Sequence, residues 1–311
     1  MVELFEWQEK DCKINLATSG IEPFTDIEHL EKDDEDPLYI LAERYNVKKE
    51  NVVIVHGAQE GLFFSLMAMK PKEIFIPLPA YPPMFEQAFE LGIKVNFVDD
   101  VYSLKNKVIV MSNPNNPTGE YINIEELVSN NNIVIVDEIF KYFVTEKDEF
   151  IDNTILISST SKFFNFKNKK VGWVIAGKEL SKKIAAIRDL ISPEPISEKG
   201  LLQLIYKNFD VFKKRNREII SKNLNVVRKM NVKKFNMIYK EMMPVMVLER
   251  KGLDSLRYCN GLLKEKGILL TPLHFFKWKN GVRLFIGTSD HEKFKKAISE
   301  INNYNEKNLL N

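Results

Sequence analysis

The sequence predicts an α/β fold: a large domain with a mostly parallel sheet flanked by helices, followed by a smaller α+β domain. The first observation is that short apolar runs alternate with helical stretches from about residue 51 to residue 177. The second is that the runs at 108–111, 133–136 and 155–157 are continuous and rich in β-branched residues. Such runs are typical of central strands in a parallel sheet, buried on both faces.

Four further runs complete the expected strands of the large domain. Each lies between helical or polar stretches and combines apolar with β-branched residues. We place this large domain at residues 36–205, and we expect residues 1–35 to form an N-terminal segment that packs on the small domain. The four runs are 52–55, 73–77, 94–98 and 171–176.

The pattern changes to a helical one after residue 177. It continues to about Met230, with an interruption near 192–195 and a long helix over 210–230. We assign residues 206–311 to the small domain, in which smaller mixed elements follow. These are strands at 244–248 and 282–286 and helices near 254–266 and 290–302.

Composition narrows the class of protein. The 311 residues carry a formal net charge of +2, which gives no reason to expect nucleic acid or an acidic membrane surface as a partner. No apolar run approaches the roughly 20 residues that span a bilayer. The two cysteines, Cys12 and Cys259, lack metal spacing and are interpreted as reduced thiols, and acidic residues near the start do not fit a secretory signal. We therefore expect a cytoplasmic protein without a metal site.

Polar side chains follow the three central runs. The loop 113–119, the pair Asp137 and Glu138, and the stretch 158–162 each come directly after one of them. Ligands of open α/β sheets bind at the carboxyl ends of the strands, so an amide, a carboxylate and a lysine are expected at one rim. Lys162 could form an imine with an aldehyde cofactor. The alternative is a surface lysine at a strand end.

Asp137 favours one kind of cofactor. Burial raises the pKa of a carboxylate in this position unless a cation pairs with it, and a protonated pyridine nitrogen is such a cation. The alternatives are a helix N-cap or a Mg²⁺ ligand in a nucleotide enzyme. The second would require a glycine-rich phosphate loop ending in Lys-Ser or Lys-Thr, and the sequence has none.

Other polar positions fit the same ligand. Gly57, Ala58 and Gln59 open a helix, where free amides bind phosphate, and Ser159, Ser161 and Lys170 are able to complete that site. The structural alternative is a helix start that binds nothing.

Three residues would contact the cofactor ring or the substrate. Tyr81, followed by two prolines, would stack on a flat ring, and Asn116 would offer its amide to a phenolate oxygen. Arg283 lies inside an apolar run and needs a carboxylate partner, either from a substrate or from a structural glutamate. The structural alternatives for the first two are a core tyrosine and an ordinary turn.

In their order and spacing these stretches resemble the pyridoxal-phosphate-dependent aminotransferases of fold type I, class I/II, and within them the histidinol-phosphate aminotransferase-like branch. The resemblance runs from about residue 36 to residue 300. It implies that Lys162 forms the Schiff base, that Asp137 partners the pyridine nitrogen and that Arg283, with Asn116, binds the substrate. It also implies cofactor contacts from a larger set: Gly57, Ala58, Gln59, Tyr81, Asn116, Ser159, Ser161 and Lys170.

Three positions depart from the family pattern. Lys170 stands where an arginine is usual, so charge is kept but the bidentate fork is lost. Phe140 replaces a tyrosine that would hydrogen-bond the phenolic oxygen. The stretch 33–37 lacks the tyrosine that the family often supplies to the neighbouring subunit, although a homodimer remains the expectation.

The expected function is transfer of an amino group between an L-amino acid and a 2-oxo acid. Contacts to the substrate side chain are expected from 21–24, Asn115 and 272–276. Two alternatives stay open: a decarboxylase on the same fold, similar to those acting on threonine phosphate, and a catalytically inactive protein that binds the cofactor.

Overall fold

The larger sheet of the molecule has seven strands in the order β2-β8-β7-β6-β5-β3-β4. The computed structural model describes residues 3–230 and 234–304. Strand β8 is antiparallel to its neighbours β2 and β7, and the other neighbouring pairs are parallel. The strands are β2 (Val52–Val55), β3 (Glu73–Pro77), β4 (Lys94–Val98), β5 (Val108–Ser112), β6 (Ile133–Asp137), β7 (Thr154–Ser159) and β8 (Gly172–Ile175).

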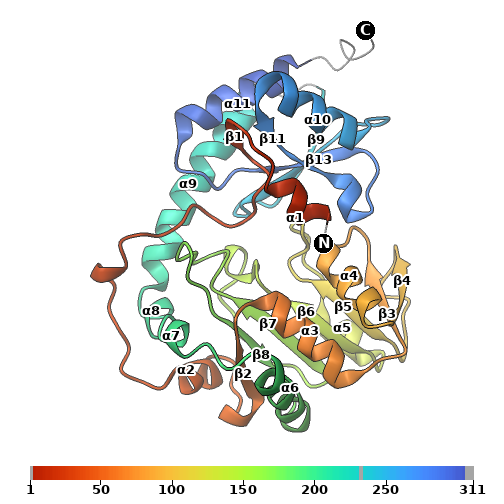
Figure 1. Ribbon diagram of the computed structural model, residues 1–311, viewed down its shortest axis with the longest axis vertical. Coiled ribbons are helices and arrows are strands. Elements are labelled where there is room, and N and C mark those ends of the chain that lie inside the picture. Colours follow the sequence, from red (N-terminus) through yellow and green to blue (C-terminus); the bar gives the residue numbers. More distant parts are fainter. Residues whose placement is uncertain (1–2, 231–233, 305–311) are drawn as a thin grey trace.

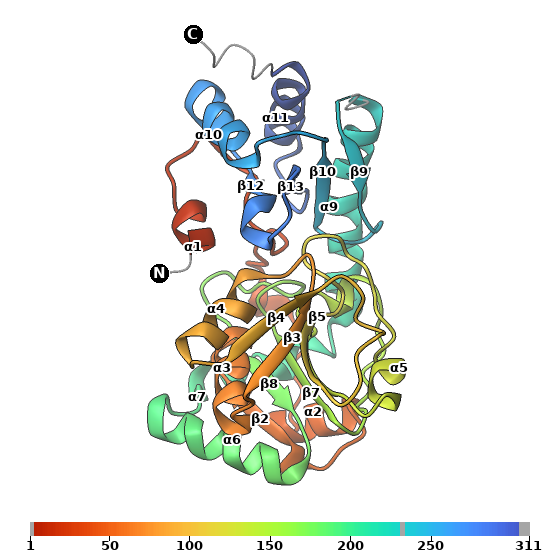
Figure 2. The same cartoon turned by 90° about the vertical axis from the view of Figure 1, so that its right-hand side faces the viewer.

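Helices cover both faces of this sheet (Figures 1 and 2). On one face, α3, α4 and α6 bury an apolar cluster that includes Val55, Ile135 and Ile157. On the other face, α2 and α5 contact β2 and β6. The predicted α/β class with a mostly parallel sheet is confirmed. The helices of this part are α2 (Pro37–Arg44), α3 (Ala58–Met69), α4 (Pro82–Glu90), α5 (Ile124–Ser129), α6 (Lys178–Ile191), α7 (Ile196–Lys199) and α8 (Leu202–Ile205).

The C-terminal part is built on a second, antiparallel sheet in the order β12-β13-β10-β9. The long helix α9 runs alongside both parts of the molecule and joins them (Figure 1). It packs against α11 through its buried residues, as its apolar spacing predicts. The elements are α9 (Phe209–Met230), β9 (Asn236–Ile238), β10 (Val245–Glu249), α10 (Ser255–Lys266), β11 (Ile268–Leu269), β12 (Thr271–Pro272), β13 (Gly281–Phe285) and α11 (His291–Asn303).

The N-terminal segment contacts both parts. Its helix α1 (Glu3–Gln8) and strand β1 (Ile14–Asn15) lie against the C-terminal part, where β1 pairs with β11 and Trp7 Nε1 donates to the carbonyl of Leu270 at 2.7 Å. Farther along, the amide of Asp33 donates to the carbonyl of Gln203 at 2.8 Å. The domain limits between residues 35 and 36 and between residues 205 and 206 stay predictions. Residues 1–2 of the predicted N-terminal segment and residues 231–233 and 305–311 of the predicted small domain lie outside the described residues.

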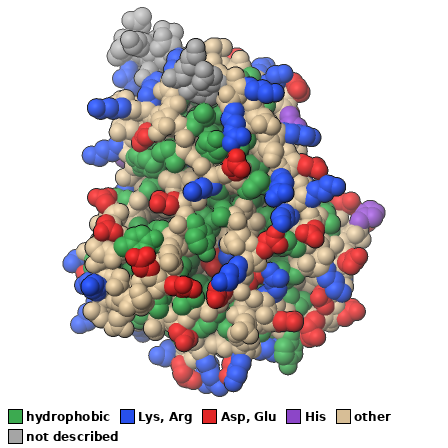
Figure 3. Space-filling view, turned by 180° about the vertical axis from the view of Figure 1, so that it is seen from behind, with side chains coloured by type: hydrophobic (Ala, Val, Ile, Leu, Met, Phe, Trp, Pro, Cys, Tyr) green, Lys and Arg blue, Asp and Glu red, His purple; other side chains and the backbone are tan. Residues whose placement is uncertain are grey.

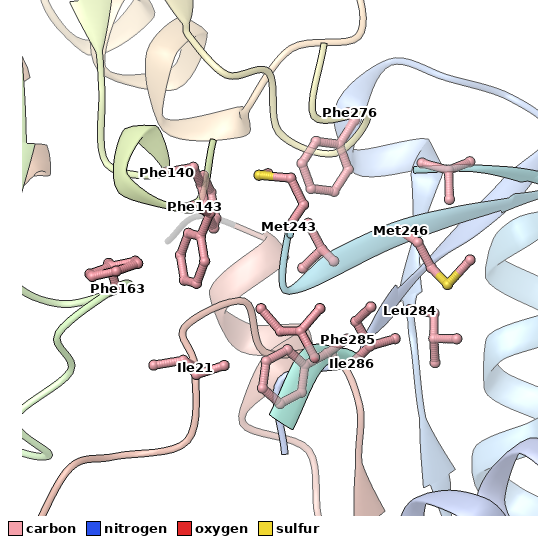
Figure 4. Packing of buried hydrophobic residues seen from close by; sticks show 14 of the residues in the cluster. Ile21, Phe140, Phe143, Phe163, Met243, Met246, Phe276, Leu284, Phe285 and Ile286 are labelled. Carbon is pink, nitrogen blue, oxygen red and sulfur yellow. The ribbon is translucent and has the colours of Figure 1, made fainter. Parts of the chain in front are cut away.

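One apolar core runs through both parts. Phe140, Phe143 and Phe163 from the large part meet Ile21 and Phe285 in the region drawn in Figure 4. On the face shown in Figure 3, basic and acidic side chains are interspersed around a central strip of apolar ones. Within the described residues, no helix combines the length and the apolar character needed to cross a membrane.

Candidate active site

A cavity of about 460 Å³ opens at the carboxyl ends of β6 and β7. Parallel strands deliver the residues that follow them to the same edge, which is why side chains distant in sequence meet there. Among the predicted site residues, Ser159 and Arg283 lie outside the lining. The predicted residues that line the cavity are Gly57, Ala58, Gln59, Tyr81, Asn116, Asp137, Ser161, Lys162 and Lys170.

Asp137 ends strand β6 at the floor of this cavity and is 8% exposed. Its Oδ1 accepts from the amide of Ile139 at 3.0 Å. Burial raises the pKa of Asp137 to about 6, although the Ile139 N–H and the charge of Lys162 act in the opposite direction. Within the described residues Asp137 forms no ion pair. The carboxylate is thus held in place by a short turn while its charge lacks a close cation.

Lys162 lies just after β7 and reaches into the same cavity. Its Nζ donates to Ser19 Oγ at 2.9 Å. Burial and the charges of Arg283 and Lys170 lower the pKa of Lys162 to about 8, while Asp137 opposes the shift. An amine with such a pKa is partly neutral near physiological pH and is able to accept a proton.

Arg283 lies on β13 at 1% exposure, behind Asn116. Its Nη1 donates to Asn116 Oδ1 at 3.1 Å, and its Nη2 donates to the carbonyl of Ala17 at 2.7 Å. Its Nε has no hydrogen-bond partner among the described residues, and burial lowers its pKa to about 10. No structural glutamate pairs with it in the part of the chain described here, so the carboxylate that the buried arginine requires is open to a ligand.

The opening of helix α3 lines one end of the cavity. Gly57 precedes the helix, and the aliphatic end of Lys170 lies beside it, 3.5 Å from where a Cβ on Gly57 would be. Gly172 permits this arrangement, because a Cβ there would lie 2.6 Å from Gly57 Cα. Free helix amides, the hydroxyl of Ser161 and an ammonium group form the chemistry of a phosphate site.

Ser159 and the loop 113–119 hold this site from behind. The Oγ of Ser159 accepts from the amide of Ser161 at 3.3 Å, so Ser159 shapes the loop and does not line the cavity. Asn115, expected near the substrate, donates to the carbonyl of Pro79 at 2.9 Å and accepts from Thr118 Oγ1 at 2.9 Å. Its amide therefore supports the loop that presents Asn116.

Tyr81 precedes α4 at the wall of the cavity. Its hydroxyl accepts from Gln59 Nε2 at 3.3 Å. Burial and the charge of Asp137 raise the pKa of Tyr81, so its hydroxyl stays protonated. The ring is thereby fixed between the opening of α3 and the carboxylate.

The sequence patterns missed several residues of the lining. Ser19 lies in the N-terminal segment, where nothing in the local pattern indicates a contact with Lys162. His56 also lines the cavity, and its Nδ1 lies 3.1 Å from Glu60 Oε2. Phe140, by contrast, was named from the sequence as the replacement of a site tyrosine; it lines the cavity and packs against Phe143.

The stretch 33–37, which lacks the expected tyrosine, has a structural role. Asp36 Oδ1 accepts from the amide of Leu38 at 2.9 Å and so caps helix α2. Its Oδ2 lies 2.9 Å from Lys49 Nζ. This stretch therefore stabilises the start of the large domain.

Comparison with known proteins agrees with this geometry. Residues 24–301 match the family model described as aminotransferase class I and II. The (5-formylfuran-3-yl)methyl phosphate transaminase of Methanocaldococcus jannaschii is 30% identical, with 82% of this chain and 75% of the relative covered. The histidinol-phosphate aminotransferase of Clostridium beijerinckii is 26% identical, with 80% and 75% covered.

A solved structure shows the same fold. A PLP-dependent aminotransferase from Streptococcus suis superposes with a TM-score of 0.84 at 19% identity, with 97% of this chain and 96% of that chain covered. Together with the family match, this likeness confirms the resemblance stated above. The chain belongs to the class I and II aminotransferases, and it is a pyridoxal-phosphate-dependent transferase of fold type I.

Proposed function

We propose that Lys162, Asp137 and Arg283 carry the transamination in this chain, with Asn116 beside the arginine. The observation that supports this most is that Asp137 and Lys162 line one cavity, that the buried Arg283 lies behind its lining residue Asn116, and that none of the three has an ion-pair partner among the described residues. Unpaired buried charges are unfavourable, so their retention at one place indicates a ligand that pairs with them.

The cavity fits pyridoxal phosphate in its chemistry. Asp137 offers a carboxylate to a protonated ring nitrogen, Tyr81 an aromatic face, and the opening of α3 with Ser161 and Lys170 a phosphate site. When bound, the cofactor supplies an aldehyde for covalent attachment and a ring that takes up electrons from the substrate. A protonated ring nitrogen would stabilise the charged form of Asp137, whose pKa burial raises to about 6.

Lys162 holds and moves the proton. Its pKa of about 8 leaves part of the amine neutral near physiological pH, so Nζ would be able to accept the proton of the substrate α-carbon and hold it. Arg283 supplies the positive charge for the substrate α-carboxylate from behind Asn116, whose Oδ1 accepts from its Nη1 at 3.1 Å. A substrate held in this way presents its α-hydrogen to Lys162 and keeps its carboxylate bound to Arg283.

The visible absorption spectrum of the purified protein, wild type beside Lys162→Ala, tests the assignment. We expect a yellow band in the wild type that changes when an amino acid is added, and no such band in the variant. A wild-type protein that stays colourless with added pyridoxal phosphate would contradict the assignment of the site.

We also propose that the substrates are an L-amino acid and a 2-oxo acid, and that the carbon skeleton stays intact. The decarboxylase alternative predicts release of carbon dioxide, because the group that Arg283 grips would leave. Product analysis separates the two: a 2-oxo acid in stoichiometric amount supports transamination. Bound cofactor without any half-reaction would support the inactive binding protein.

A cytoplasmic homodimer completes the proposal. Leu190, Ile191 and Ile196 are 86%, 55% and 84% exposed, and Ser192 between them contacts His56 at the cavity wall. Apolar side chains exposed together mark an interaction site, and this one adjoins the active site. Light scattering should give twice the chain mass for the wild type, and Leu190→Glu with Ile196→Glu should shift it toward the monomer. Cys12 and the buried Cys259 are free thiols, which supports a reducing compartment.

A further inference from the structure

The hydrogen bond between Lys162 and Ser19 joins two segments that are 143 residues apart. Ser19 is 7% exposed and lines the cavity, with its Oγ 2.9 Å from Lys162 Nζ. Among the described residues, Ser19 is the hydrogen-bond partner of the Lys162 amine. The position of this hydroxyl therefore decides where the amine rests when it is free.

Hydrogen bonds to the residues that precede Ser19 fix its position. The carbonyl of Ala17 accepts from Arg283 Nη2 at 2.7 Å and from Thr271 Oγ1 at 2.9 Å. The carbonyl of Leu16 accepts from the amide of Phe285 at 3.0 Å, and this bond joins the same segment to the end of β13. The group that grips the substrate carboxylate thus also holds the segment that carries Ser19.

The following residues tie the segment to Lys162 itself. The amide of Ile21 donates to the carbonyl of Lys162 at 3.1 Å. Gly20 permits this close approach, because a Cβ there would lie 2.9 Å from the carbonyl oxygen of Ser161 and 3.5 Å from Lys162 Cδ. The backbone is therefore held on both sides of Ser19, which keeps this residue next to the amine.

We propose that Ser19 is a positioning residue for Lys162: its hydroxyl accepts one N–H of the free amine and so directs the lone pair toward the substrate α-carbon. The inference rests on the proposed role of Lys162 as the proton-transferring base. A free lysine side chain samples many rotamers. When one N–H is held by a hydrogen bond, the amine samples fewer rotamers, and its lone pair keeps one orientation. Ser19 is neutral, so it orients the amine without placing a carboxylate beside it that would hold it as an ammonium ion.

Two measurements on Ser19→Ala test the proposal. In the full-length chain freed of cofactor, the pH dependence of Lys162 acetylation by acetic anhydride, followed by mass spectrometry, reports the pKa of the amine. Loss of the accepting hydroxyl should lower that pKa by about 0.5 to 1. In the loaded enzyme, the rate constant of the half-reaction with an amino acid should fall about three- to tenfold with KM nearly unchanged, the range that one net hydrogen bond provides.

Three further variants serve as controls. Ser19→Thr keeps the hydroxyl and should keep both values near those of the wild type. Thr18→Ala removes a hydroxyl from the exposed neighbouring position and should change neither value. Ser19→Cys replaces the hydroxyl by a weak acceptor and provides a second test if Ser19→Ala fails to fold, as judged by circular dichroism.

The outcomes separate the two proposals. Equal labelling profiles for Lys162 in the wild type, Ser19→Ala and Ser19→Cys, with equal half-reaction rates, would overturn the role of Ser19. A wild type that removes no α-proton from any amino acid would instead overturn the proposed function. The labelling profile in the cofactor-free chain still decides the role of Ser19 in that case, because it requires no turnover.

Discussion

Two clusters of buried charge lie next to each other in this chain, and they differ in pairing. In the cavity, Asp137 and Lys162 lack ion-pair partners among the described residues. Behind it, Lys141 is 2% exposed, and its Nζ lies 2.8 Å from Glu138 Oε2 and 2.6 Å from Asp148 Oδ1. The second cluster, which we call the paired cluster, consists of Glu138, Lys141 and Asp148 together with Tyr45, whose hydroxyl donates to Glu138 Oε2 at 3.0 Å.

The two lysines show what the difference means. Burial disfavours the charged form of both. In the paired cluster the charges of Glu138 and Asp148 outweigh burial, and the pKa of Lys141 is raised. In the cavity burial dominates, and the pKa of Lys162 falls to about 8. The buried Lys141, which has ion-pair partners, contributes to structure, whereas the partly buried Lys162, which lacks them among the described residues, is available for chemistry.

The largest effect is expected from Lys162→Ala. Because a positioned proton-transferring group contributes about 10²- to 10⁴-fold, turnover should fall by at least that factor. The free energy of unfolding of the cofactor-free protein should not fall, since an unpaired buried amine is removed. Steady-state kinetics with urea denaturation measures both. Activity near that of the wild type would show that the cavity lysine is not the base.

Lys141→Met is expected to act mainly on stability, in contrast to Lys162→Ala, which acts mainly on turnover. Removing the lysine leaves Glu138 and Asp148 buried without their cation, and breaking such a pair destabilises a protein by about 3–5 kcal/mol. Urea denaturation measures the change. Lys182→Met, which removes the exposed partner of Glu179, is the matched control and should change stability little. If the two variants were equally stable, the paired cluster would have no structural role.

The residues that meet at the cavity were predictable from the sequence, whereas the paired cluster was not. The apolar runs gave the central strands closely: the run 133–136 became β6, Ile133–Asp137. The rule that ligands lie at the carboxyl ends of parallel strands then brought Asn116, Asp137 and Lys162 to one place. The strand prediction was confirmed because it depends on local pattern, and the shared location of the three side chains follows from one general property of sheets, while their roles stay predictions.

The remaining features depend on contacts between distant segments. Glu138 and Lys141 are three residues apart, but the partners Tyr45 and Asp148 come from other elements, so nothing in the local pattern distinguishes Lys141 from a surface lysine. The contact of Ser19 with Lys162 has the same origin. The reversed direction of β8 is a further case, because an apolar run has the same composition in either direction.

Asp137→Asn tests the cost of the unpaired carboxylate. The folded-state pKa of about 6 lies above the ordinary 3.8, so the charged form destabilises the fold. The penalty is fully present above about pH 6, decreases as pH falls, and is gone below about pH 4. The variant should therefore be more stable than the cofactor-free wild type by about 1–3 kcal/mol at pH 7 and equal to it at pH 4, while turnover falls. Urea denaturation at several pH values measures this, and a stability gain that persists at pH 4 would assign it to another cause.

The smallest effect is expected from Lys170→Arg. Lys170 lies beside the opening of α3, and a guanidinium there would offer a bidentate fork to a phosphate where the ammonium offers a point charge. The gain of about one hydrogen bond should tighten cofactor binding about two- to fivefold. Titration with pyridoxal phosphate in the Lys162→Ala background isolates this non-covalent affinity, because the covalent attachment is absent. Lys169→Arg, an exposed neighbour outside the cavity lining, is the control and should bind as before. Equal affinities for Lys170→Arg and its parent would mean that the helix amides and Ser161 already saturate the phosphate, and that the departure at Lys170 has no bearing on cofactor affinity.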